Sequence, residues 1–304
     1  MEKIFEFFGW TNGQICRFWD WVNLFKNFSL SGFSLKRFFA GIMAILECFG
    51  CILFDTPVSP NGQALDLTGY SLVFEDEFEG DSLDTDAWFY RGVPNERGGH
   101  NSASQVRVEN GNLIITGEHL ENGEYGAGWY TEEIALRELY CKGYFEIKCI
   151  CSESDDFWSA FWIQSSTSSP YNHYASQGGV NGAEIDIFEA MSADKILKGN
   201  RNAITTTIHC NGVDDDIENI DSLCLGDFKG KNIYREYNTY GLEWTDDEYI
   251  FYINGVETSR SSFGKGVSQI PEMVLISLCA PSEFDKPLDY KTEFIVDSVR
   301  IYQK

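Results

Sequence analysis

Three carboxylates stand close together in the segment Glu184-Ile-Asp-Ile-Phe-Glu189, which is otherwise apolar and typical of a β-strand. Burying an ionised carboxylate without a partner is costly, so a purely structural strand would exclude such residues. Because side chains alternate faces along a strand, Glu184 and Asp186 share one face, whereas Glu189 falls on the other. A single β-bulge between Asp186 and Glu189 would return Glu189 to the acid face and turn Phe188 toward the core or into the bulge. The spacing therefore predicts a bulged strand.

Carboxylates arranged in this way can cleave a glycosidic bond. The Cα atoms of Glu184 and Glu189 would lie roughly 13 Å apart at about 3.3 Å per residue. Side chains that lean inward would bring the two carboxyl groups to roughly 5–5.5 Å, the separation of a retaining glycosidase. Acids this close cannot all stay ionised, so at least one pKa should rise and supply a general acid at neutral pH. The alternatives are a solvated strand face or a cation site.

The acidic segment resembles the bulged E-x-D-x-x-E signature of glycoside hydrolase family 16, the form found in laminarinase-like, agarase-like and carrageenase-like members. Further matches follow in the family's order over about residues 72–303. They are DEF (76–78), SLD (82–84) with Trp88, VENGNLII (108–115), GYFEIK (143–148), FWSAFW (157–162), YGLEW (240–244), YING (252–255) and VDSVRIY (296–302).

The resemblance implies a role for each acid. Glu184 would be the nucleophile, Glu189 the general acid and base, and Asp186 the residue that orients Glu184 and tunes its charge. His209 resembles the family's histidine on the strand beside the acids, where it would hydrogen-bond the nucleophile or the leaving side. A structural histidine whose hydrogen bonds are satisfied within its strand is the alternative for His209.

Sugars present apolar C–H faces, so a glycan site needs aromatic side chains beside its polar groups. Trp158 takes the place of the family's cleft-lining tryptophan, and Trp162 has the same parity in the expected strand, although burial in a sandwich core is the alternative for both. Further candidates for substrate binding lie in what we expect to be glycine-rich and polar loops, namely Trp129, Tyr171, His173 and Tyr174.

A structural calcium ion, without a part in catalysis, is also implied by the resemblance. In the family this ion often joins the first and last strands through backbone oxygens and one aspartate. Those ligands map to Glu77, Gly111 and Asp297, and oxygen ligands suit a hard cation. No cofactor is expected for the reaction itself.

Composition agrees with one large β domain. Strand-like runs separated by turn signals recur after residue 70, including Asn254-Gly255, which marks a tight hairpin. We therefore expect an all-β jelly-roll sandwich of the concanavalin A type over residues 71–304, with an open concave cleft and a monomeric state. The net charge of −24 argues against a nucleic-acid partner. Nine cysteines, an odd number, argue against a complete disulfide framework.

Residues 1–54 differ from the rest of the chain, since they carry 14 of the 46 aromatic residues with five basic and four acidic residues. Residues 38–54 form an apolar run interrupted only by Glu47, and residues 55–70 are expected to form a linker. The apolar run could be an export signal, a short transmembrane span, or part of a pair of amphipathic helices. We favour membrane association or export, with an extracellular or envelope location; a cytoplasmic enzyme is the alternative.

The sequence thus predicts a retaining endo-glycoside hydrolase that cleaves internal β-glycosidic bonds by double displacement. The expected substrate is a β-1,3-glucan or a mixed-linkage β-glucan. An agarase-like β-galactan hydrolase, a transglycosylase, and a carbohydrate-binding sandwich without catalysis are the alternatives. The three intact acids weigh against the last of these.

Overall fold

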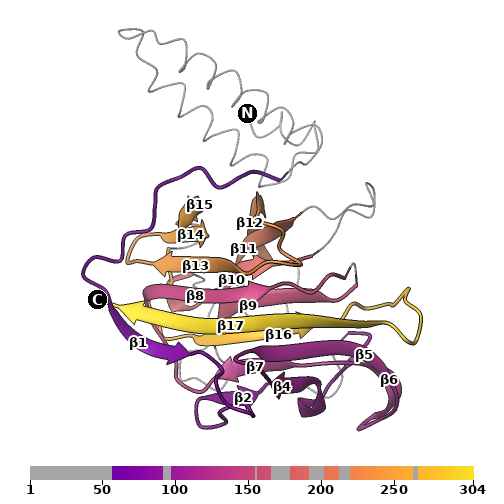
Figure 1. Cartoon of the computed structure of the whole chain (residues 1–304). Helices are drawn as coiled ribbons and strands as arrows, with labels where there is room; N and C mark the ends of the chain where they lie inside the picture. The colour runs from indigo at the N-terminus through magenta and orange to yellow at the C-terminus, as the bar shows by residue number, and fades with distance from the viewer. Residues whose placement is uncertain are drawn as a thin grey trace, which may run out of the picture.

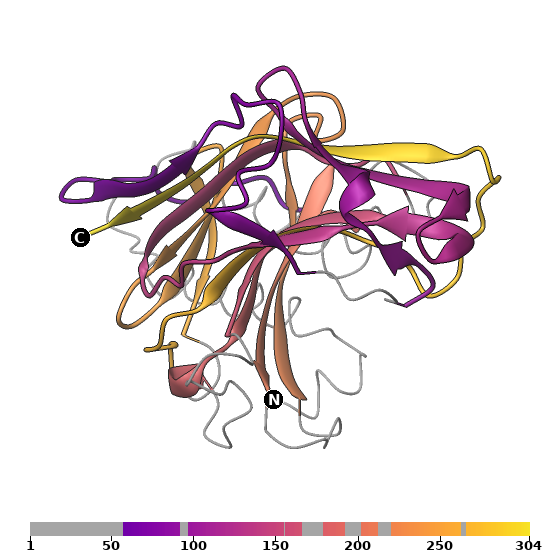
Figure 2. The ribbon, with the colours of Figure 1, turned by 90° about the horizontal axis from the view of Figure 1, so that it is seen from below.

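The computed structural model describes residues 57–91, 97–154, 156–165, 179–191, 202–211, 220–262 and 266–304. Within these residues two β-sheets pack face to face, and the only helices are the short 3₁₀ turns η1 (Ala103–Gln105) and η2 (Gly179–Asn181) (Figures 1 and 2). The prediction of an all-β sandwich is confirmed. Residues 1–56, including the apolar run, lie outside the described part of the chain. In that described part no helix has the length and apolar character needed to cross a membrane.

Each sheet is nearly all antiparallel; the one parallel pairing recorded between strands of the described residues joins β3 and β6. The larger sheet runs in the order β15 (Val256–Ser261), β14 (Tyr249–Ile253), β13 (Asn238–Trp244), β8 (Gly143–Ile150), β17 (Lys291–Gln303), β5 (Leu113–Gly123), β6 (Gly126–Thr131) and β3 (His100–Asn101), with β1 (Ser71–Asp76) beside β17 and β4 (Val106–Val108) beside β5. The smaller sheet runs in the order β12 (Ile220–Lys229), β11 (Ala203–Asn211), β10 (Glu184–Glu189), β9 (Trp158–Gln164), β16 (Met273–Cys279), β7 (Glu133–Leu136) and β2 (Trp88–Tyr90).

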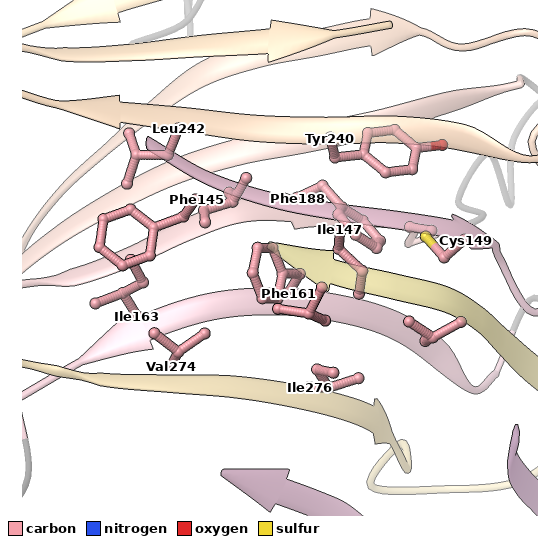
Figure 3. Close-up of a cluster of buried hydrophobic side chains, with 14 of the residues drawn as sticks. Phe145, Ile147, Cys149, Phe161, Ile163, Phe188, Tyr240, Leu242, Val274 and Ile276 are labelled. Carbon is pink, nitrogen blue, oxygen red and sulfur yellow. The ribbon is translucent and has the colours of Figure 1, made fainter. Parts of the chain in front are cut away.

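The hydrophobic core fills the space between the two sheets (Figure 3). In β8 the alternate residues Phe145, Ile147 and Cys149 are fully buried, and they face Phe161 and Ile163 of β9 across the core. Alternation in β9 sends the neighbouring residues of that strand to the outer face of the smaller sheet. The core therefore fixes which side chains the smaller sheet presents outward.

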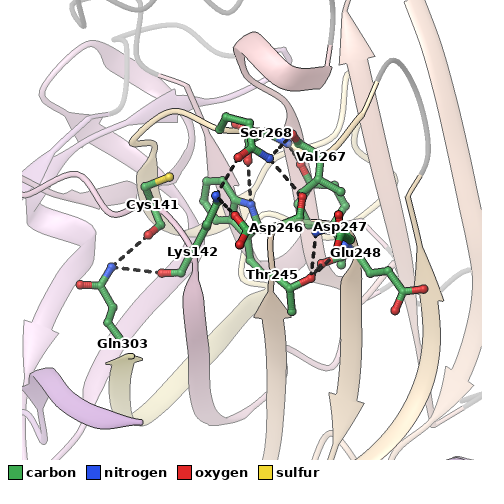
Figure 4. A network of polar contacts seen from close by, with 12 residues as sticks. Cys141, Lys142, Thr245, Asp246, Asp247, Glu248, Val267, Ser268 and Gln303 are labelled. Atoms are coloured by element: carbon green, nitrogen blue, oxygen red, sulfur yellow. Dashed lines mark hydrogen bonds and ion pairs between the residues drawn. The ribbon is translucent and has the colours of Figure 1, made fainter. Parts of the chain in front are cut away.

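Turn chemistry sets the register at one edge of the larger sheet. Asn254 and Gly255 both have positive φ, +50° and +72°, and they form a two-residue connection in which Ile253 pairs with Val256. Positive φ at both central residues is the type I′ geometry, so the hairpin predicted from Asn-Gly is confirmed. The preceding turn is closed by the Thr245 hydroxyl, which accepts hydrogen bonds from the backbone N–H groups of Asp247 and Glu248 (Figure 4).

The segment expected to be a linker is packed against the domain. Val58 pairs with Phe228 of β12, and Ala64 pairs with Val256 of β15. The segment thus runs from the edge strand of the smaller sheet to the edge strand of the larger one. Leu65 and Leu67 then pack on tyrosines of the larger sheet's outer face. Backbone hydrogen bonds and apolar contacts thus hold residues 57–70 against the domain, and their role as a linker to the preceding residues stays a prediction.

Three of the described cysteines, Cys141, Cys149 and Cys151, are free thiols. Burial raises the pKa of the Cys149 thiol well above its ordinary value, so this thiol is an unreactive core residue.

Candidate active site

Strand β10 carries the three acids on the outer face of the smaller sheet. Opposite β11, Asp186 pairs with Thr207 and Glu189 pairs with Thr205, so three steps along β10 match two steps along β11. The register also shifts against β9 between Asp186 and Phe188. Phe188 is buried, with its ring centroid 4.3 Å from that of Tyr240 in the opposite sheet. The predicted bulge is confirmed, and it returns Glu189 to the face of Glu184 and Asp186.

The surroundings of Glu184 and Glu189 affect the pKa values of the two carboxyl groups differently. Burial and, after it, the charge of Asp186 raise the pKa of Glu189 to about 8, while a hydrogen bond from Trp158 opposes the rise. Burial and Asp186 also raise the pKa of Glu184, and His209, Gln164 and Arg91 all act in the opposite direction. Glu189 is therefore protonated at neutral pH, and Glu184 is surrounded by groups that favour its ionised form.

His209 lies on β11 directly opposite Glu184. Its Nε2 atom is 3.1 Å from Oδ2 of Asp186. Burial alone would lower the pKa of His209, but the hydrogen bond with Asp186 and the nearby carboxylates raise it overall. The structure thus shows His209 in contact with Asp186, whereas the sequence led us to expect a contact with the nucleophile or the leaving side.

Strand β9 supplies the aromatic side chains. Trp158 and Trp162 are both half-buried on the outer face, so their alternative role as core residues does not apply. Trp158 Nε1 donates a hydrogen bond of 3.1 Å to Oε1 of Glu189, and Trp162 Nε1 donates one of 3.1 Å to the Ser277 hydroxyl. Both predicted tryptophans therefore lie beside the acids.

Each tryptophan is covered by an arginine that the sequence did not single out. The Arg97 guanidinium lies over the Trp158 ring at 4.4 Å, and that of Arg91 lies over the Trp162 ring at 5.2 Å. Arg97 has a positive φ of +54° and is followed by Gly98, whose N–H donates to Pro281 O. These contacts add cationic side chains to the acid-bearing face.

A further polar residue on this face is Gln164, which donates from Nε2 to Oε2 of Glu184 and accepts a hydrogen bond from Arg91. Its parity was the available signal, because residues 158, 160, 162 and 164 of a regular strand share a face. Arg91 follows the short strand β2. No pattern in the sequence indicated that its side chain would extend across the sheet to Gln164.

Trp129 and Tyr171 were the two other candidates for substrate binding. Trp129, expected in a loop, lies in strand β6, is 8% exposed, and stacks on Phe284 with ring centroids 4.7 Å apart. The expected loop placement was wrong, because Trp129 is part of a strand. Its ring is occupied by packing and offers little surface to a sugar. Tyr171, like His173 and Tyr174, lies outside the described residues.

The residues expected to hold calcium have other partners. Asp297 lies 3.0 Å from the Lys148 ammonium, Glu77 is ion-paired with Arg300, and Gly111 is in a turn beside Glu79. The calcium site stays a prediction.

The comparisons with known proteins match most of the described chain. Residues 72–286 match the family model of the glycoside hydrolase family 16 domain of β-porphyranases A–D. The endo-1,3-1,4-beta-glycanase ExsH of Rhizobium meliloti (strain 1021) is 24% identical over 66% of this chain. The glucan endo-1,3-beta-glucosidase A1 of Niallia circulans is 23% identical over 83% of it. The chain spans 40% of the length of each of these two relatives.

Solved structures share the fold. The crystal structure of porphyranase B from Zobellia galactanivorans aligns with a TM-score of 0.63 and 20% identity, covering 82% of this chain and 98% of that one. The likeness confirms the jelly-roll sandwich predicted from the resemblance. Since the family model matches well over half of the sequence, this chain belongs to glycoside hydrolase family 16.

Proposed function

We propose that this protein is a retaining endo-glycoside hydrolase that cleaves internal β-1,3 or mixed-linkage bonds of a β-glucan. The observation that carries the proposal is the bulge in β10, which gathers Glu184, Asp186 and Glu189 on one face and leaves Glu189 protonated at neutral pH. A nucleophile and an adjacent proton donor are the two groups that a double displacement requires.

In the first step the carboxylate of Glu184 attacks the anomeric carbon, and the bond to the glycosidic oxygen breaks. Glu189 gives its proton to that oxygen, so the leaving chain departs as a neutral alcohol. Asp186 lies between the two glutamates along the strand and raises the pKa of Glu189, which keeps the donor protonated before attack.

In the second step the ionised Glu189 takes a proton from water, and the resulting hydroxide displaces Glu184 from the anomeric carbon. Two inversions return the β configuration. The relatives named as a 1,3-1,4-glycanase and a 1,3-glucosidase support a β-glucan as the substrate.

A β-galactan is the second candidate substrate, and it shares the same chemistry. The family model that matches this chain is that of β-porphyranases, and porphyranase B has a similar fold. Substrate choice within one chemistry is set by the residues that contact the neighbouring sugars. The cation-covered faces of Trp158 and Trp162 would be part of that selection.

The test compares reducing ends released from laminarin, lichenan, agarose and porphyran by the wild type and by Glu184→Gln. We expect release from laminarin or lichenan, products of intermediate length at early times, and β-anomers as the first products by ¹H NMR. Glu243→Gln is the matched control. Glu243 lies on the larger sheet, away from the acid-bearing strand, and accepts hydrogen bonds from Tyr70 and Tyr252. We expect this substitution to leave turnover unchanged.

Each other outcome has a defined meaning. Release from agarose or porphyran alone would show that the substrate is a β-galactan and not a β-glucan. Transfer to added oligosaccharides in place of hydrolysis would indicate a transglycosylase. Binding of a glycan without release would favour a carbohydrate-binding protein and would contradict the proposed function.

A further inference from the structure

A chain of polar contacts on the acid-bearing face connects three strands to the expected nucleophile. Glu133 of β7 is ion-paired with Nη1 of Arg91, which follows β2. Nη2 of Arg91 donates to Oε1 of Gln164 at 2.6 Å, and Nε2 of Gln164 donates to Oε2 of Glu184. The amide of Gln164 thus lies between a guanidinium group and a carboxylate.

The chemistry of the two ends fixes the orientation of this amide. A guanidinium group has only donors, so the side that faces Arg91 must be the amide oxygen. The NH₂ group is then directed at Glu184, and it binds a carboxylate oxygen that has to accept. Rotation of the amide would place the NH₂ against the donors of Arg91 and the oxygen against the carboxylate. Gln164 is therefore a donor to Glu184 because Arg91 holds it in that orientation.

Arg91 is itself held by several contacts. Its backbone N–H donates to Glu133 O at 2.9 Å, in addition to the side-chain ion pair between the same residues. Its guanidinium lies 5.2 Å above the ring of Trp162, whose own N–H is bound to Ser277. A residue anchored at three points, two of them on its side chain, loses little further entropy when it binds Gln164.

We infer that Gln164, oriented by Arg91, is a positioning residue that fixes the rotation of the Glu184 carboxylate and favours its ionised form. Because the amide holds Oε2, we assign the attack on the anomeric carbon to the other oxygen of Glu184. The inference rests on the proposed function, in which Glu184 is the nucleophile. Hydrogen bonds to the charged form of an acid favour that form, and the Arg91 charge adds to the effect.

The test uses Gln164→Met, which keeps the length of the side chain and removes both the donor and the acceptor. We expect kcat to fall about 10- to 100-fold, the usual effect of losing a hydrogen bond to a charged group, with KM changed little. The acidic limb of kcat/KM should move to higher pH, because Glu184 loses a group that favours its ionised form. A purely structural role would not move this limb.

Gln303→Met is the matched control. Gln303 is half-buried at the end of β17, and its Nε2 donates to the carbonyl oxygens of Cys141 and Lys142 (Figure 4). The substitution removes two hydrogen bonds in the larger sheet, whereas the acids lie on the smaller sheet. We therefore expect a lower Tm with unchanged kcat and an unchanged pH profile. Measuring Tm for every variant separates loss of folding from loss of positioning.

A double-mutant cycle tests whether Arg91 acts through Gln164. Arg91→Met leaves the amide without its orienting partner, so this variant should lose kcat in the same direction as Gln164→Met. The double variant should lose less than the product of the two single losses, because Arg91 acts on Glu184 partly through Gln164 and residues that act as a unit are not additive. Losses that multiply would show independent roles and would overturn the inference.

A titration that needs no substrate keeps this inference separate from the proposed function. The ¹³Cδ signal of Glu184, assigned by its loss in Glu184→Gln, should titrate at higher pH in Gln164→Met than in the wild type. An unchanged titration would refute the inference even in an active enzyme. A raised titration in a protein that hydrolyses no tested glycan would support the positioning role while the proposed function failed.

Discussion

Trp158 Nε1 donates a hydrogen bond of 3.1 Å to Oε1 of Glu189, so the aromatic side chain beside the site and the proposed proton donor act as one unit. The hydrogen bond favours the ionised carboxylate and limits how far burial raises its pKa. We propose two separable functions for Trp158, in which its ring contacts a sugar and its N–H tunes the pKa of Glu189.

Replacing Trp158 with phenylalanine should separate these functions, because phenylalanine keeps an aromatic face and lacks the N–H. We expect the pKa of Glu189 to rise further, which moves the basic limb of kcat/KM to higher pH. Trp162→Phe is the control, since its N–H binds Ser277 and not an acid, and it should leave that limb in place. A basic limb that is unchanged in Trp158→Phe would contradict the tuning role.

The wild-type pH profile follows from the two glutamates. Glu189 must be protonated, so kcat/KM should fall as pH rises through about 8. Glu184 must be ionised, and its pKa is raised by burial and Asp186, so the acidic limb should lie above the ordinary range of a glutamate. Initial rates on the preferred glycan between pH 4 and pH 10 measure both limbs, which belong to the coupled pair. An acid-shifted optimum below pH 4 would contradict this assignment.

Asp186→Asn removes a charge and keeps the size of the side chain. Asp186 raises the pKa values of both Glu184 and Glu189, so both limbs of the profile should move to lower pH. The pKa of His209, which Asp186 raises through a hydrogen bond, should fall as well, and His209 ¹H NMR titration measures this directly. Limbs that stay in place would contradict this electrostatic role of Asp186.

The bulge in β10 could be predicted from the sequence, because it depends only on residues that are close together along the chain. Side-chain parity over Glu184, Asp186 and Glu189 requires a bulge wherever one face is buried, and the structure has one. The Asn254-Gly255 hairpin is local in the same sense, since two positive φ angles favour those residues.

The contacts that the sequence did not reveal join strands that are distant along the chain. Arg91 reaches Gln164 and Glu133 only because β2, β7, β16, β9 and β10 are neighbours in that order, and a pattern of alternation does not determine strand order. Trp129 was misplaced because its flanking glycines resemble a loop. One of them, Gly128, instead makes room for His100, which would lie 3.0 Å from an added Cβ atom.

Glu272 provides a prediction about stability. Its fully buried carboxyl accepts hydrogen bonds from Ala183 N, directly before the acidic strand, and from the Ser268 hydroxyl. Within the described residues its other oxygen, Oε2, is buried without a hydrogen-bond partner. Burial raises the pKa of Glu272 to about 8, against an ordinary value of 4.5. The folded protein therefore holds a proton that the unfolded chain releases over this range.

The free energy of unfolding should accordingly fall as pH rises from about 4.5 to about 8, by about 1.4 kcal/mol per pH unit for each such proton. Glu272→Gln keeps an acceptor for Ala183 and Ser268 and cannot ionise, so its stability should depend less on pH than that of the wild type. Glu272→Leu removes the acceptor and should lower stability at every pH, by about 1–3 kcal/mol. Urea denaturation at pH 5, 6.5 and 8 measures all three proteins, and equal slopes for the wild type and Glu272→Gln would show that Glu272 is ionised in the folded protein throughout.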